Sequence, residues 1–430
     1  MSSLLAIVSS AWLPTAFVAA LALYLRARSG SWLAPSSFLG LVWSCYLPVS
    51  LLAVDHPLPG LGIWALLSLI VAVQIGSLVA EATAAEHSRN AMPAAGFSWE
   101  EGRRIRRSCW LVFLTALAGC AYFVYGTLRL FDQSFTFASL IQMASRWTLL
   151  RYDEFFEPWP MRLAAIWAYP AALLGGVWFG ISCGWRDKSL GLLSLLPCLL
   201  ITFLTGGRAA FLVGLACWLG GSWSGRVVRL PGAAKLLSRG TLLCLAALAG
   251  GLLLFFVAVN TFRGAGNATD TRDFALDFNS PQIRNYMFGP PAAFVDWFDH
   301  DDRGPHTWGA RTFPGLYDLL RIQRRTMGTY LDSANTVGTE GTNIFTMFRG
   351  LVEDFTLPGA FLVCGFWGYS SARAYSRHSA QAIPLLSLAA YYAVALFSPL
   401  YCLFSFNSSV FAWVVAWLVL RQKAGESLTA

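Results

Sequence analysis

The sequence has few charged side chains and very little lysine. Asp, Glu, Lys and Arg together make up 13% of the 430 residues, against about 25% in soluble globular domains. Hydrophobic residues reach 56%. This composition excludes a soluble globular chain, because too little polar side chain is present to cover so much apolar surface. We therefore expect an all-α, polytopic integral membrane protein.

Metal-binding and disulfide patterns are also missing. The five histidines are scattered along the chain and lack cysteine companions, so no metal site and no cofactor are expected. The longest polar stretch, residues 260–354, has no cysteine, which argues against a disulfide framework. The first apolar run has neither a basic segment before it nor a small-residue cleavage site, so no cleavable signal peptide is expected.

Long apolar runs are abundant. A membrane-spanning helix needs about 20 mostly apolar residues, and about eleven runs approach this length. We expect spans at Leu4–Leu25, Phe38–Val54, Leu61–Ala80, Cys109–Leu128, Leu163–Cys183, Ser189–Thr205, Ala209–Ser222, Thr241–Val259, Phe355–Ala372, Ala382–Cys402 and Asn407–Leu420.

Basic residues in alternate loops predict the orientation of the chain. Lys and Arg in short loops stay in the cytoplasm, and one set of loops holds all three lysines and most of the arginines that flank spans. This places the N-terminus outside the cytoplasm and the C-terminus inside it. The net charge of +8 comes largely from these loops and is explained by attraction to the lipid bilayer; no nucleic-acid partner is expected.

Three parts follow from this organisation. Residues 1–259 hold spans one to eight, with an external segment at 131–162. Residues 260–354 form a large, partly helical external loop, in which Pro290–Phe298 and Phe313–Arg325 are predicted helices. Residues 355–430 hold spans nine to eleven.

The large loop carries nine arginines and no lysine. A guanidinium is a rigid fork that meets phosphate or carboxylate with two parallel hydrogen bonds, whereas a lysine ammonium is a mobile, strongly hydrated point charge. The bias favours oriented oxyanion binding; a genome-wide preference for arginine codons is the alternative explanation. The nine residues are Arg263, Arg272, Arg284, Arg303, Arg311, Arg321, Arg324, Arg325 and Arg349.

Two further features on the external side are candidates for substrate binding. Gly207 and Arg208 form a short turn between two spans, where a helix start favours an anion; an arginine reaching to the headgroups is the alternative. The segment 131–162 interleaves Arg151 and Tyr152 with aromatic residues such as Trp159. These residues fit either a membrane-interface aromatic belt or a sugar-binding surface.

The loop ends in Asn343, a stretch rich in Phe and Thr, and then Arg349, Glu353 and Asp354 before a span. If this stretch is helical, Arg349 and Glu353 are four residues apart and share a face. The two acids are either interface anchors, or one of them is a general base in a partly dehydrated cleft.

These features resemble the Wzy-type O-antigen polymerases, the repeat-unit polymerases of bacterial surface polysaccharides. The resemblance rests on the Gly207-Arg208 turn, on Arg263 just beyond the next upward span, and on the run from Asn343 to Phe355, together with the segment 307–316. The chain has Thr356 where the family pattern usually has glycine, with Gly359 a turn later.

The resemblance implies a metal-independent membrane glycosyltransferase, similar by analogy to the C-type glycosyltransferases and O-antigen ligases. Such an enzyme moves a glycan from undecaprenyl pyrophosphate onto a second lipid-linked repeat unit, at the periplasmic face of the bacterial inner membrane. The resemblance thus implies that the N-terminus, the segment 131–162 and the loop 260–354 are periplasmic. A Wzz-type chain-length regulator and a flippase are the expected protein partners.

Site residues follow from the resemblance and the chemistry. Arginines stabilise the pyrophosphate leaving group, and a carboxylate or histidine takes the acceptor's proton. The expected set is Arg208, Arg263, Arg311 and Arg349 for pyrophosphate, Glu353, Asp354 and His306 for catalysis, and Arg151, Tyr152, Trp159 and Asn343 for glycan.

Three other functions are compatible with parts of the sequence. An O-antigen ligase has similar topology and a similar donor but another acceptor. A flippase or other transporter is disfavoured, because no internal repeat is seen and the span interiors lack acids, bases and histidines, Gln74 being a rare polar exception. A purely structural scaffold leaves the arginines unexplained.

Overall fold

The apolar runs fold as helices, because a helix satisfies every backbone polar group within its own segment, as a membrane requires. The computed structural model describes residues 11–54, 60–88, 99–136, 139, 147, 163, 165–205, 208–230, 251, 281–300, 306–323, 330, 334–337, 340–377 and 381–421. Helices make up most of these residues, with one small sheet. The expected class, a helical membrane protein, is confirmed at this level.

The helices follow the sequence closely. The apolar helices are α2 (Trp12–Ser29), α3 (Pro35–Ala53), α4 (Gly60–Ser88), α5 (Trp99–Leu130), α8 (Ala168–Ile181), α9 (Trp185–Leu193), α10 (Leu196–Thr205), α11 (Arg208–Arg229), α17 (Met347–Arg377), α18 (Ala382–Phe397) and α19 (Asn407–Arg421). Each predicted apolar run overlaps one of these helices or a consecutive pair, except Thr241–Val259, which lies outside the described residues apart from Gly251.

Five apolar stretches in the described part of the chain have the length and composition needed to cross a membrane. They are Pro35–Ala53, Leu61–Thr83, Trp99–Leu130, Trp185–Thr205 and Ala209–Arg229. Shorter apolar helices are Ala168–Ile181, Ala382–Phe397 and Asn407–Arg421. The helix α18 has 16 residues, or about 24 Å at 1.5 Å per residue. It ends at Phe397, and the carbonyl of the next residue, Ser398, accepts a hydrogen bond from the Met347 N–H of α17.

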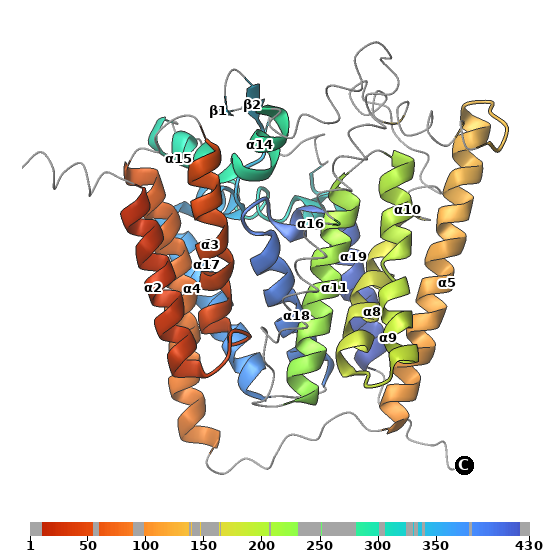
Figure 1. Cartoon of the computed structure of the whole chain (residues 1–430), viewed down its shortest axis with the longest axis horizontal. Helices are drawn as coiled ribbons and strands as arrows, with labels where there is room; N and C mark the ends of the chain where they lie inside the picture. The colour runs from red at the N-terminus through yellow and green to blue at the C-terminus, as the bar shows by residue number, and fades with distance from the viewer. Residues whose placement is uncertain are drawn as a thin grey trace, which may run out of the picture.

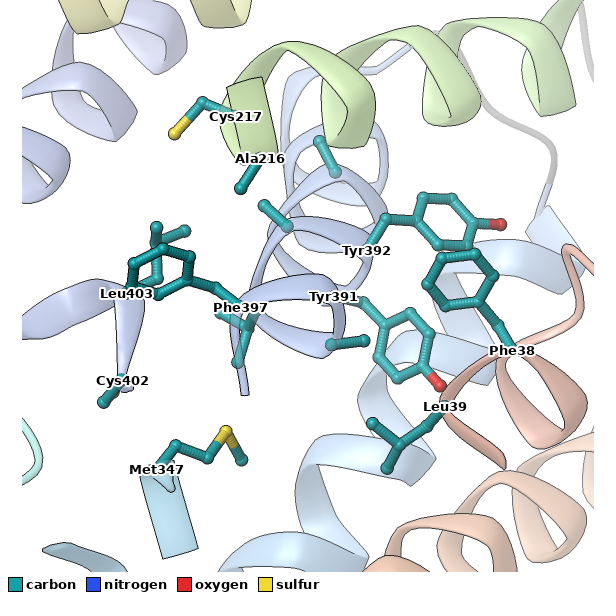
Figure 2. Packing of buried hydrophobic residues seen from close by; sticks show 14 of the residues in the cluster. Phe38, Leu39, Ala216, Cys217, Met347, Tyr391, Tyr392, Phe397, Cys402 and Leu403 are labelled. Atoms are coloured by element: carbon teal, nitrogen blue, oxygen red, sulfur yellow. The ribbon is translucent and has the colours of Figure 1, made fainter. Parts of the chain in front are cut away.

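Figure 1 shows the helices in two groups, α2, α3, α4 and α17 on one side and α5, α8, α9 and α10 on the other, with α11, α18 and α19 between them. Aromatic side chains connect α18, which lies between the groups, to α3 of the first group. The hydroxyl of Tyr391 in α18 donates to the carbonyl of Pro35 at 2.6 Å. The ring of Tyr392 meets Phe38 edge-on, with 4.9 Å between centroids, and Figure 2 shows both tyrosines extending from α18 toward α3.

Glycine lets α4 and α17 cross with their backbones in contact. A Cβ atom added at Gly76 would lie 1.9 Å from the carbonyl oxygen of Gly365, and one added at Gly368 would lie 1.9 Å from that of Val73. Ser77 donates a hydrogen bond to the Gly368 carbonyl at 3.2 Å. Close backbone approach through small residues is how helices associate in a membrane, where burial of apolar surface supplies little driving force.

The described residues of the large loop contribute three more helices and the sheet, which gather at one end of the helices (Figure 1). These elements are α14 (Pro281–Phe288), α15 (Pro290–His300), α16 (Pro314–Leu319), β1 (Ala334–Val337) and β2 (Glu340–Thr342). The strands are antiparallel, with Ala334 opposite Thr342 and an irregularity between Asn335 and Val337.

The structure corrects one predicted boundary, divides one predicted span into two helices, and adds elements that were not predicted. The predicted helix Phe313–Arg325 is wrong in its length, because α16 ends at Leu319 and Arg321 adopts a left-handed backbone at φ 57°. The predicted span Ser189–Thr205 divides into α9 and α10 at Ser194 and Leu195. The sheet and α14 were not predicted, since their sequences carry no clear periodicity of two or 3.6 residues.

We expect Gly368→Ala to destabilise the protein and Gly365→Ala to leave it at least as stable. A methyl group at Gly368 collides with the Val73 carbonyl, whereas one at Gly365 is 3.8 Å from its nearest neighbour, the Ala72 carbonyl. Overpacking costs about 1–3 kcal/mol, while Gly to Ala in an open helix position gains about 0.5–1 kcal/mol. Thermal unfolding in detergent measures both. Equal melting temperatures for the two variants would contradict the close crossing.

Candidate functional site

The helix α17 is divided by a break at Thr356, where the backbone has φ 60° and ψ 172°. We call residues 347–355 the first half-helix. It begins beside the middle of α3: the Met347 N–H donates to the Ser398 carbonyl at 3.0 Å, and the indole of Trp43 donates to the Ser398 hydroxyl at 3.0 Å. The helix begins at Met347, and its break at Thr356 lies one residue after the start predicted for this span at Phe355.

Asp354 is fully buried and ties the first half-helix to the turn formed by residues 307–312. One carboxylate oxygen accepts hydrogen bonds from the Thr307 hydroxyl at 2.5 Å and from the Arg311 N–H at 3.1 Å. The other accepts from the Thr312 N–H at 2.7 Å. A buried carboxylate is tolerated only when its oxygens are hydrogen-bonded, and these three donors meet that requirement.

Gly350 lets the turn lie directly on the half-helix. A Cβ atom at this position would be 3.2 Å from the Arg311 carbonyl oxygen and 3.4 Å from the Thr312 nitrogen. The turn itself uses left-handed backbone at Trp308, with φ 50°, and at Gly309, with φ 98°. This contact brings Arg311 to the half-helix although the two are about forty residues apart in sequence.

Glu353 lies between two arginines. Its Oε1 is 2.8 Å from Nε of Arg349 and its Oε2 is 3.5 Å from Nε of Arg311. The helical spacing predicted for Arg349 and Glu353 is thus confirmed. Exposure separates the two guanidinium groups: the Arg349 side chain is 5% exposed and that of Arg311 is 45% exposed. Of the two arginines, Arg311 is therefore the one that a ligand from outside can reach.

Three aromatic rings surround the Arg349 guanidinium. Its central carbon is 3.8 Å from the ring centroid of Tyr330, 4.0 Å from that of Phe345 and 4.9 Å from that of Trp297 in α15. Cation–π contacts of this kind strengthen when they are desolvated. Together with Glu353, the rings hold Arg349 in one orientation.

Tyr330 is neutral in this surrounding. Burial raises the pKa of the Tyr330 phenol well above its ordinary value, and the nearby Glu353 raises it further, against smaller lowering effects of Arg349 and Arg311. The ring face of Tyr330 is thus an electrostatic partner of Arg349 that carries no negative charge. Glu353 remains the ionic partner that the structure describes for it.

The structure brings together four of the residues expected from the sequence, namely Arg311, Arg349, Glu353 and Asp354. His306 lies exposed just before the turn, and Asn343 lies exposed between β2 and α17. Arg208 is the first residue of α11, as expected, but its side chain is outside the description. Arg151, Tyr152, Trp159 and Arg263 lie outside the described residues.

Sequence reasoning missed the aromatic surround and the anchoring threonines. Trp297, Tyr330 and Phe345 come from three separate segments, so no spacing rule connects them. Thr307 and Thr312 lie in a segment whose resemblance was noted, but nothing in it indicated that Asp354 is their partner. Among the described residues, no three His, Cys, Asp or Glu side chains gather as metal ligands would; the absence of a metal stays a prediction.

The fold and the site define a helical membrane protein. Its charged cluster forms where the turn 307–312 of the large loop packs on the first half-helix of α17. Comparison with protein-family models, with curated proteins and with solved structures found no match. The resemblance to surface-polysaccharide polymerases therefore rests on the residues of this chain alone.

We expect Asp354→Asn to lower the stability of the protein by about 1–3 kcal/mol, because an amide nitrogen would face backbone N–H donors that are then left without an acceptor. Asp296→Asn is the matched control, since the Asp296 side chain is 58% exposed and surface changes stay within about 0.5 kcal/mol. Thermal unfolding in detergent compares the two. Similar small effects would show that the carboxylate of Asp354 does not anchor the turn.

Proposed function

We propose that this protein is a surface-polysaccharide polymerase of the bacterial inner membrane. It transfers a growing glycan from undecaprenyl pyrophosphate to the sugar end of another lipid-linked repeat unit, on the periplasmic face. The observation that carries the proposal is the Arg311, Glu353 and Arg349 cluster, which unites an accessible guanidinium with a carboxylate in the segment whose sequence resembles the polymerases.

Charge along the helices supports a periplasmic position for this cluster. Arg26 and Arg28 lie in the last turn of α2, and the next helix, α3, runs to its far end at Ala53, whose carbonyl accepts a hydrogen bond from Arg284 of the large loop. Basic residues and the large loop thus lie at opposite ends of α3. Under the positive-inside rule, the loop end is periplasmic. Eleven spans with the N-terminus outside and the C-terminus inside complete this proposed topology.

The reaction needs a base and a stabilised leaving group. The acceptor hydroxyl attacks the anomeric carbon of the donor glycan and forms the new C–O bond. The bond from that carbon to the pyrophosphate oxygen breaks, and the electron pair leaves with the pyrophosphate. A carboxylate takes the hydroxyl proton. Fixed guanidinium groups stabilise the charge that develops on the leaving oxygen.

The contacts divide these roles among the residues. Glu353 is our candidate base, because its side chain is 18% exposed and its contacts with Arg311 and Arg349 fix its orientation. Asp354 is assigned to holding the turn, since both of its oxygens accept hydrogen bonds from 307–312. Arg311 contacts the pyrophosphate, and Arg349 positions Glu353. In this proposal Arg208 and Arg263 provide further contacts to the same pyrophosphate.

The substrates define the partners. Both substrates are undecaprenyl-pyrophosphate-linked oligosaccharides, so a flippase must deliver them to the periplasmic face. A chain-length regulator of the Wzz type would act on the same growing polymer. Neither partner is needed to explain the chemistry of the site.

We expect Arg311→Lys to reduce polymer formation by about 10-fold or more while stability stays within about 0.5 kcal/mol. Loss of a charge-assisted, two-pronged hydrogen bond is worth about 1.5–3 kcal/mol, and each 1.4 kcal/mol is about 10-fold in rate. Arg321→Lys, an exposed arginine of the same loop, is the control. Polymer ladders on gels and melting temperatures give the two readouts.

Arg349→Lys should instead lower both activity and stability, because a lysine cannot keep the stacking on three rings and the Glu353 contact together. A loss of activity in Arg349→Lys without loss of stability would contradict the role of Arg349 as a buried positioning group.

Full activity of the Arg311→Lys variant would show that Arg311 does not bind the pyrophosphate.

The proposed function is tested by deleting the gene in its host and resolving the surface polysaccharide on a gel. A polymerase predicts that the ladder collapses to a band carrying one repeat unit, because export and attachment continue. Absence of any repeat unit at the surface contradicts the proposal. In that case, lipid-linked polymer outside the membrane would indicate a ligase, and its absence would indicate a flippase.

A further inference from the structure

Thr356 has a backbone conformation that side-chain-bearing residues rarely adopt. Its φ of 60° and ψ of 172° fall in a region that is populated almost entirely by glycine. The other non-glycine residues with positive φ in the described part of the chain, Asp132, Trp308 and Arg321, lie in turns. Thr356 differs from them because it separates two helical segments.

The residues after Thr356 accommodate the break. Pro358 falls in the first turn of the second segment, where a helix needs no backbone N–H donor. Gly359 gives Phe355 room, because a Cβ atom at Gly359 would lie 2.8 Å from the Cβ atom of Phe355. The sequence around the break is thus compatible with it, apart from the threonine itself.

Contacts on the other side of the break hold the first half-helix in place. Asp354, two residues before Thr356, is fixed by three hydrogen bonds to the turn 307–312. At its start, the half-helix is fixed by the hydrogen bond from Met347 to Ser398. A strained conformation persists when the surrounding structure determines it from several directions, and such strain gathers at functional sites.

We propose that Thr356 is a positioning residue of the site. Its left-handed backbone interrupts the helix so that the first half-helix docks against the turn 307–312, which sets Glu353 beside Arg311. The strain at Thr356 is a property of the fold, and its effect on catalysis rests on the proposed function.

Glycine and proline substitutions at this position have opposite consequences. Glycine adopts φ 60° without strain, so Thr356→Gly should raise the melting temperature by about 1–3 °C and keep the wild-type polymer ladder. Proline fixes φ near −65° and cannot adopt the left-handed backbone of this position, so Thr356→Pro should displace the first half-helix from the turn 307–312 and reduce polymer at least 10-fold. Thr115→Gly in α5 is the matched control, because glycine inside a regular helix is destabilising and should lower the melting temperature.

A stability measurement tests docking without any assay of activity. Asp354→Asn should lower the melting temperature of Thr356→Gly as much as that of the wild type, because the half-helix stays on the turn. In Thr356→Pro the same change should have little further effect, since the contact is already lost and the two changes are not additive.

Several results would overturn the proposal. Thr356→Gly overturns it if its melting temperature falls as that of Thr115→Gly does, or if it loses polymer while folded. Wild-type polymer from Thr356→Pro overturns it as well. If Thr356→Pro does not fold, the glycine variant alone decides. If gene deletion leaves polymer length unchanged, the proposed function fails, and the melting temperatures of the Thr356 and Asp354 variants still decide whether Thr356 positions the half-helix.

Discussion

The buried carboxylate of Asp354 connects the large loop to the membrane helices. Burial of a charge is costly unless its oxygens are hydrogen-bonded, and the turn 307–312 supplies two backbone N–H groups and one hydroxyl. The turn is thereby fixed on the first half-helix, where Gly350 leaves room for it. Arg311 reaches Glu353 because of this docking. The geometry of the charged cluster therefore depends on the buried carboxylate of Asp354, which is not itself exposed to a ligand.

Local irregularity and regular packing serve different purposes in this protein. Glycines at the crossing of α4 and α17 let two helices meet backbone to backbone, which fixes the part of α17 that follows Thr356. The break at Thr356 then allows the preceding half-helix to follow a different direction. The helical scaffold thus has regular, unstrained backbone. The strained residue Thr356 lies three residues from Glu353, which we propose as the base.

Much of the helical framework could be predicted because its signals are local. Apolar length indicates a helix, and the four-residue spacing of Arg349 and Glu353 predicts their contact once the segment is helical. The aromatic surround of Arg349 could not be predicted, because Trp297, Tyr330 and Phe345 come from separate segments. Nor could the roles of Glu353 and Asp354 be separated, since adjacent acids look alike until their partners are known.

The sequence by itself determined that this is a helical membrane protein with an arginine-rich loop. The length of an apolar run indicates a membrane environment for that segment whatever its tertiary contacts are. Tertiary structure alone decided which arginine is buried and which is accessible. It also decided where α17 breaks, because the strained backbone of Thr356 is unfavourable locally and persists through contacts made by residues distant in the chain.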